Sequence, residues 1–244
     1  MLDRVLRWDA CINVRDLGGL PAAHGAVAHG ALVRSDALHR LTGDGLAALV
    51  AHGVRTVIDM RTPEEVEARP DPLEITRRVA HCHIAQQTED VWTAIGRGVD
   101  RVSFDTSALE RCAWRFAAIA EAVAGASEGG VLIHCEVGKD RTGLMTMLLL
   151  DLVGTPADEI AADYALTGPA LAPLFTELIA TATVAERRAR LEEEARCRPE
   201  VSHAILSWLR KRYGGAEAYL LAGGAASRSL ERIRERMLGA SRTI

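Results

Sequence analysis

The stretch VLIHCEVGKDRTG occupies positions 131–143, and it decides how the rest of the chain can be organised. Its first three residues are apolar and a polar loop follows them, a pattern typical of a fully buried strand that ends at a site. The apolar segment 144–153 that comes next predicts a helix. A strand, a loop and a helix at this spacing form one βα unit of a mostly parallel sheet.

Strand and helix patterns alternate on the N-terminal side of this unit, whereas beyond Gly154 the chain reads as helices only. The polar segment 86–105 contains two glycines and predicts a loop, and Pro169 and Pro173 are expected to break the chain. We therefore expect one α/β domain over 1–244, with an all-helical portion at 155–244. The predicted strands cover 31–35, 54–60 and 78–84, and the predicted helices cover 41–52, 109–124, 175–195, 202–213 and 227–238.

Composition narrows the class of protein. The 244 residues carry a formal net charge of −4, which disfavours a nucleic-acid binder. No apolar run reaches the 18 or so residues of a membrane helix, and the first residues do not resemble a signal peptide, so we expect a cytoplasmic protein without an integral membrane segment. The five cysteines are scattered without a CxxC pair, which predicts free thiols and neither a zinc site nor disulfides.

The loop itself suggests phosphoryl chemistry. Backbone N–H groups from Glu136 through Arg141 can line a nest for an anion, which the dipole of the following helix reinforces. Gly138 permits the tight turn, and Arg141 can fold back to hold two phosphate oxygens. Cys135 at the mouth of such a nest is favoured as a thiolate nucleophile, and Thr142 can donate its hydroxyl to the sulfur. The alternative is a buried cysteine at a strand end.

The pattern His-Cys-x5-Arg-Thr resembles the phosphate loop of cysteine-dependent protein tyrosine and dual-specificity phosphatases. The fuller string HCEVGKDRTG at 134–143 is similar to that of bacterial tyrosine phosphatases typified by the mycobacterial tyrosine phosphatase B, some of which also hydrolyse phosphoinositides. The segments 13–19, 57–61 and 162–164 also resemble blocks of this group. The resemblance implies a three-layer tyrosine phosphatase-like fold with a central, mostly parallel sheet, and it raises the question of a lid at about 170–198.

The resemblance also implies roles. Cys135 would form a phosphocysteine, Arg141 would stabilise the equatorial oxygens, and His134 would orient the loop. Two candidates for the general acid remain open: Asp140 inside the loop and Asp59 at the end of a strand that finishes at the same sheet edge. Asp140 could instead only hold the loop in shape.

For Asp59 the alternatives are a helix cap or an ion pair with Arg61. Lys139, one of two lysines in the chain, would suit a polyanionic head group, and the alternative for it is an exposed surface lysine.

We therefore expect a phosphomonoester hydrolase that uses neither metal nor cofactor and releases inorganic phosphate. Phosphotyrosine in proteins is the leading substrate, with dual specificity or phosphoinositides as alternatives. Two other classes stay open: a catalytically silent phosphate-binding module and a sulfurtransferase of the rhodanese type, which also presents a cysteine on an anion-binding loop.

Overall fold

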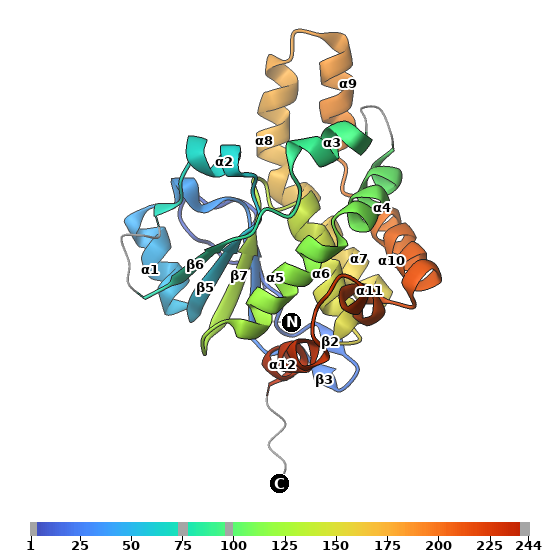
Figure 1. Cartoon of the computed structure of the whole chain (residues 1–244). Helices are drawn as coiled ribbons and strands as arrows, with labels where there is room; N and C mark the ends of the chain where they lie inside the picture. Colours follow the sequence, from blue (N-terminus) through green and yellow to red (C-terminus); the bar gives the residue numbers. More distant parts are fainter. Residues whose placement is uncertain (1–3, 73–77, 96–99, 240–244) are drawn as a thin grey trace.

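The computed structural model describes residues 4–72, 78–95 and 100–239, and its centre is a five-stranded sheet (Figure 1). The sheet order is β1-β4-β7-β5-β6, in which β4, β7, β5 and β6 run parallel and the short β1 is antiparallel at one edge. A separate hairpin joins β2 and β3. The strands are β1 (Arg15–Asp16), β2 (Pro21–Ala22), β3 (Gly25–Ala26), β4 (Leu32–Ser35), β5 (Val54–Asp59), β6 (Ala80–His83) and β7 (Gly130–His134).

The two faces of the sheet are covered by separate apolar clusters, because successive side chains of a strand point to opposite faces. In β7, Val131 and Ile133 join the larger cluster with α5 and α6, whereas Leu132 joins the cluster that includes Leu49 of α1. Helices therefore lie on both sides of a mostly parallel sheet, which confirms the predicted three-layer α/β class.

Helices account for most of the remaining chain. The helix α6, which follows the loop after β7, is almost entirely buried, because it packs between the sheet and the C-terminal helices. The helices are η1 (Leu38–Arg40), α1 (Gly43–Ala51), α2 (Pro63–Ala68), α3 (Glu89–Ile95), α4 (Arg101–Arg111), α5 (Ala113–Gly125), α6 (Asp140–Leu152), α7 (Ala157–Ala165), α8 (Thr167–Thr181), α9 (Ala185–Glu194), α10 (Pro199–Tyr213), α11 (Ala216–Ala222) and α12 (Ser227–Leu238).

Three expectations about local structure are wrong. The segment 86–105 contains α3 and the start of α4 rather than only a loop, and its residues 96–99 lie outside the described part. The prolines do not break the chain at 169 and 173, because Pro169 lies in the first turn of α8, where its missing N–H is tolerated, and Pro173 lies inside the helix. The predicted helix 175–195 is instead divided by residues 182–184 into α8 and α9.

The helices α8 and α9 stand out from the body as a hairpin, at the end of the molecule where α2 and α3 also lie (Figure 1). A third apolar cluster at Leu171, Phe175, Ala182 and Leu191 holds the hairpin together. Val137 of the loop after β7 packs against this cluster, so the hairpin contacts the loop. In the part of the chain that the structure describes, no helix is both long and apolar enough to cross a membrane.

Candidate active site

The loop between β7 and α6 carries the cysteine and the arginine singled out by the sequence. Cys135 is 2% exposed and follows directly on the last residue of β7, and Arg141 lies in the first turn of α6. Burial lowers the pKa of the Arg141 guanidinium, but Glu65 and the sulfur of Cys135 raise it by more, so the sulfur and the guanidinium interact electrostatically. Among the described residues, no backbone carbonyl accepts the N–H groups of positions 136–139. These groups can bind an anion.

Gly138 is required at its position by two independent features. Its φ of +68° lies in the left-handed region, and a Cβ there would lie 2.5 Å from the carbonyl oxygen of Ser35. The loop therefore makes the tight turn that the sequence predicted, and it packs against the end of β4.

Residues near the N-terminus hold the loop in this conformation. The Asn13 amide donates to the carbonyl of Val137 at 2.9 Å, and Arg34 donates to the carbonyl of Gly138 at 2.8 Å. Arg15 in turn donates to the side-chain oxygen of Asn13 at 2.8 Å. The loop carbonyls are thus used for bracing, while the N–H groups stay available.

Glu65 orients Arg141. Its two carboxylate oxygens accept hydrogen bonds from Nη1 at 2.5 Å and from Nη2 at 2.8 Å of the guanidinium. Although burial raises the pKa of Glu65, Arg141 and the backbone at Thr62 lower it by more, so the pair is ionised. Glu65 is itself fixed by a capping box with Thr62 at the start of α2. Since a guanidinium has five N–H donors, three remain for a phosphoryl group.

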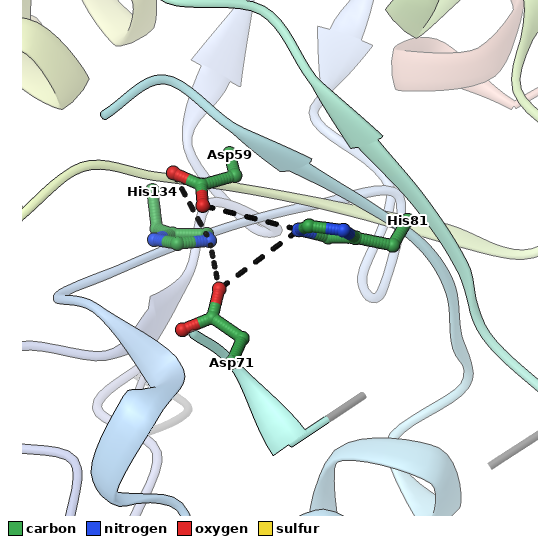
Figure 2. Close-up of side chains that lie close together, drawn as sticks. All are labelled: Asp59, Asp71, His81 and His134. Carbon is green, nitrogen blue, oxygen red and sulfur yellow. Dashed lines mark ion pairs between the residues drawn. The ribbon is translucent and has the colours of Figure 1, made fainter. Parts of the chain in front are cut away.

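The buried residues Asp59 and His134 belong to a charged cluster behind the loop, together with Asp71 and the exposed His81 (Figure 2). The imidazole Nε2 of His134 lies 3.2 Å from Asp71 and 3.8 Å from Asp59, and its Nδ1 lies 3.2 Å from the carbonyl of Cys135. Burial lowers the pKa of His134, but Asp71 and Asp59 raise it by more. Nε2 thus lies near two carboxylates but makes no hydrogen bond within the described residues, whereas Nδ1 lies within hydrogen-bond distance of the backbone at Cys135.

Asp59 forms the ion pair that the sequence left open as an alternative. Both of its oxygens accept from Arg61, with Oδ2 2.7 Å from Nη2, and neither residue is exposed. Burial raises the pKa of Asp59, but His134 and Arg61 lower it by more. The carboxylate is thus ionised and engaged within the cluster.

The same cluster has the spacing of a metal site, because four ligand atoms of Asp59, Asp71, His81 and His134 lie within 4.8 Å of one another. Two imidazoles and two carboxylates would suit zinc. However, Nη2 of Arg61 lies 2.7 Å and 2.9 Å from the Oδ2 atoms of Asp59 and Asp71. The buried guanidinium therefore already supplies the cation between the two carboxylates, and the residues fit an ion cluster better than a metal.

Asp140 lies on the other side of the loop, where its side chain is 32% exposed. Its Oδ1 lies 3.4 Å from Nη1 of Arg101 and 3.7 Å from Nζ of Lys139. Burial raises the pKa of Asp140, but Arg101, Lys139 and Arg141 lower it by more. The Oδ1 atom nevertheless has no hydrogen-bond partner among the described residues.

Lys139 is 2% exposed, so the alternative of a surface lysine is wrong. Its ammonium donates to the carbonyl of Glu194 at the end of α9, and it lies 5.9 Å from the ring centroid of Phe175 in α8. A cavity of about 800 Å³ begins beside it, and Trp92, Arg101 and Phe104 are among its other walls. Since Arg141 also lies over Trp92, at 5.6 Å from the ring centroid, this cavity adjoins the segment that joins β7 to α6.

The structure thus places Cys135 at the start of the loop, Asp140 and Arg141 in the first turn of α6 that follows it, and Asp59 in the cluster behind it. The hydroxyl of Thr142 is buried and without a partner in the described part. Sequence reasoning missed Glu65, which reads only as an acid at a helix start, and Arg101, which falls in the supposed loop. Both pair across long sequence separations, so neither pairing is visible in a local pattern.

Comparisons with known proteins agree with this geometry. A family model described as the tyrosine phosphatase family matches residues 6–239. A tyrosine-protein phosphatase of Nostoc commune is 32% identical over 224 residues, covering 87% of this chain and 76% of the relative. The triple specificity protein phosphatase PtpB of Mycobacterium tuberculosis is 33% identical over 121 residues, covering 45% of this chain and 44% of the relative. The chain therefore belongs to the tyrosine phosphatase family, and it is a phosphatase that acts on phosphorylated substrates.

Proposed function

We propose that this phosphatase is cysteine-dependent and metal-independent, with Cys135 as nucleophile, Arg141 as the phosphoryl clamp and Asp140 as the proton donor. One observation carries the proposal. A buried cysteine opens a loop with free backbone N–H groups, beside an arginine that Glu65 has already oriented. An arrangement fixed before substrate arrives can stabilise a transferring phosphoryl group without reorganisation.

In the first step the Cys135 thiolate attacks phosphorus, a sulfur–phosphorus bond forms, and the bond to the leaving oxygen breaks. Backbone N–H groups of residues 136–141 and the guanidinium of Arg141 hold the three equatorial oxygens. Asp140 gives its proton to the departing oxygen, so that the alcohol leaves neutral.

In the second step water attacks the phosphocysteine, and the Asp140 carboxylate takes a proton from that water. The sulfur–phosphorus bond breaks, inorganic phosphate leaves, and Cys135 returns as a thiolate. The buried Thr142 hydroxyl, which has no other partner in the described part, can donate to the departing sulfur. Donation to the sulfur stabilises the negative charge that develops on it.

Asp140 must carry a proton in the first step although neighbouring cations lower its pKa. A phosphoryl dianion bound at Arg141 adds negative charge next to those cations and so raises the pKa of the carboxyl again. Asp59 contributes to the acid–base work through the His134 cluster rather than by contact. Asp140→Asn and Asp59→Asn test the two roles on phenyl phosphate, and normal turnover in both would contradict them.

The leading substrate is phosphotyrosine in proteins, with a phosphoinositide as the second candidate. The second candidate is favoured by Lys139, whose ammonium lies between the loop and the α8–α9 hairpin next to a cavity. The hairpin, at about 170–198, would act as a lid. A phosphate-release panel of phosphotyrosine, phosphoserine and phosphothreonine peptides against mono- and bisphosphorylated inositides decides between these substrates.

Lys139→Ala sharpens that panel. We expect it to impair phosphoinositide hydrolysis more than phosphotyrosine hydrolysis, because one charge fewer matters most for a polyanionic head group. Equal losses of activity on both substrates would show that Lys139 does not determine substrate specificity. The exposed Lys211→Ala in α10 is the matched control.

Three measurements test the chemistry. Cys135→Ser should abolish phosphate release while the protein still binds phosphate, whereas residual turnover would exclude the phosphocysteine. EDTA should leave activity unchanged, and its loss on chelation would exclude the metal-free reaction. Turnover of thiosulfate without phosphatase activity would favour a sulfurtransferase.

We place the protein in the cytoplasm, a proposal supported by its five free cysteines.

A further inference from the structure

We propose that Arg101 is a positioning residue for Asp140, itself locked by Asp105, and that it decides how well the enzyme expels basic leaving groups. The inference rests on the proposed role of Asp140 as proton donor. It concerns a residue of α4, 39 positions before the loop acid in the sequence.

The guanidinium of Arg101 is held along one edge. Its Nε lies 2.8 Å from Oδ2 of Asp105, and its Nη2 bonds to Oδ1 of the same carboxylate. Asp105 is 2% exposed and stands one turn further along α4. Because the guanidinium is planar, a bidentate pair on one edge fixes the direction of the remaining nitrogen, Nη1.

That remaining nitrogen points at the catalytic loop. Nη1 of Arg101 lies 3.4 Å from Oδ1 of Asp140. The other cation at this oxygen, the ammonium of Lys139, lies at 3.7 Å and is already bound to the carbonyl of Glu194. Asp140 is therefore held by charge from two sides, while its Oδ1 makes no hydrogen bond within the described residues.

The start of α4 is itself well defined. Asp100 caps the helix by accepting from the backbone N–H of Ser103 at 3.0 Å, so Arg101 occupies the first helical position. Arg101 also lines the cavity of about 800 Å³ beside the loop. A leaving group that extends from the loop into this cavity would pass the Arg101–Asp140 pair.

The two carboxylates interact through the shared guanidinium. Burial and, to a smaller extent, the charge of Asp140 raise the pKa of Asp105 to about 6, although Arg101 acts in the opposite direction. Asp105 lies too deep to touch substrate, so its place in the site is to hold Arg101. The dependence runs from Asp105 to Arg101 to Asp140.

A comparison of leaving groups tests the inference. Phenyl phosphate releases a phenolate whose conjugate acid has a pKa of about 10, as for tyrosine, and needs a proton donor far more than 2,4-dinitrophenyl phosphate does. Asp140→Asn should lower kcat/KM on phenyl phosphate by roughly 100-fold and change the dinitrophenyl ester little. Arg101→Met should show the same selective loss at about 10-fold, mainly in kcat.

Non-additivity provides the second readout. Arg101→Met in the Asp140→Asn background should cost nothing more on phenyl phosphate, because the group it positions is gone. The exposed Arg111→Met, at the far end of the same helix, should leave both esters unchanged.

Loss of Arg101 leaves Asp105 as an unpaired buried charge, which can destabilise the protein. The double variant Arg101→Met with Asp105→Asn removes that charge, and the melting temperature of each variant is measured. The double variant should fold and keep the selective loss.

The outcomes separate the two proposals. If Asp140→Asn lowers kcat/KM on both esters equally, Asp140 is not the proton donor and the proposed mechanism fails. A second outcome is that Asp140→Asn lowers kcat/KM on phenyl phosphate alone while the Arg101 variants lower kcat/KM on both esters equally, or on neither. In that case Asp140 remains the proposed proton donor and Arg101 has only a structural role. A folded double variant with normal leaving-group dependence would also overturn the inference.

Discussion

At the scale of single residues, Glu65 fixes the orientation of Arg141, the proposed phosphoryl clamp. It accepts from both Nη atoms of Arg141, so the guanidinium has one orientation before a phosphoryl group arrives. We expect Glu65→Gln, which keeps the shape but removes the charge, to lower kcat/KM on phenyl phosphate by roughly 10- to 100-fold through loss of orientation. The exposed neighbour Glu64→Gln is the control and should change nothing. A faster Glu65→Gln enzyme would show instead that Glu65 competes with substrate.

A side chain at Gly138 would meet two obstacles, a strained backbone angle and a steric clash, and a comparison with Gly53 separates their effects. Gly138→Ala meets both a φ of +68° and a backbone oxygen 2.5 Å from the new Cβ. Gly53→Ala meets only a φ of +97°, since nothing lies within 4 Å of its Cβ. We expect Gly53→Ala to destabilise the protein by about 1 kcal/mol. Gly138→Ala should cost more than that and abolish turnover, as measured by urea unfolding and phosphate release. Equal losses in the free energy of unfolding for the two variants would mean that β4 shifts to accommodate the new Cβ without disturbing the loop.

At the scale of elements, local patterns predicted the βα unit because its strand, turn and helix are each specified by neighbouring residues. The strands β4, β5, β6 and β7 were confirmed for the same reason. Helices α3 and α4 were missed because their sequences are polar and two glycines lie near their junction. They are stabilised by packing and by the Asp100 cap rather than by a strong apolar period.

The α8–α9 hairpin has a core of its own, which makes its stability separable from that of the body. Leu191 of α9 is buried in that cluster and contributes to neither cluster at the sheet. Leu191→Ala should cost the hairpin about 2–5 kcal/mol and speed amide exchange over 167–194, while the unfolding midpoint of the body stays the same. The exposed neighbour Glu192→Ala is the control. A parallel drop in the global midpoint would show that the hairpin and body unfold as one unit.

At the scale of the whole molecule, Asp163 of α7 joins parts that are distant in sequence. Its carboxylate accepts from Arg4 at 2.8 Å, Arg15 at 3.0 Å and Arg34 at 2.9 Å. Arg15 and Arg34 also brace the loop after β7 through Asn13 and Gly138. No local pattern could reveal this convergence, since the partners are 129 to 159 positions apart in the sequence. One buried carboxylate thus connects the N-terminal strands, the helical third and the site.

Removal of this carboxylate should be costly and pH-dependent. Asp163→Asn removes the negative charge that pairs with the buried guanidinium groups of Arg15 and Arg34. We therefore expect a loss of about 3–5 kcal/mol in the free energy of unfolding at pH 7. Burial raises the pKa of Asp163, but Arg15, Arg34 and Arg4 lower it far more. Because the folded-state pKa lies below the unfolded value of about 3.9, the stabilisation is complete above that value and is lost as the pH falls toward the folded-state pKa.

The difference between wild type and Asp163→Asn should therefore shrink as the pH falls from about 5 to 3, which urea titrations at each pH measure. Asp158→Asn, whose side chain is 95% exposed on the same helix, should match wild type throughout. A difference that stays constant over this range would mean that Asp163 contributes through hydrogen bonds that asparagine retains or loses regardless of charge. Turnover should fall together with stability, because the arginines that lose their partner are the ones that hold the loop carbonyl of Gly138 and the amide of Asn13.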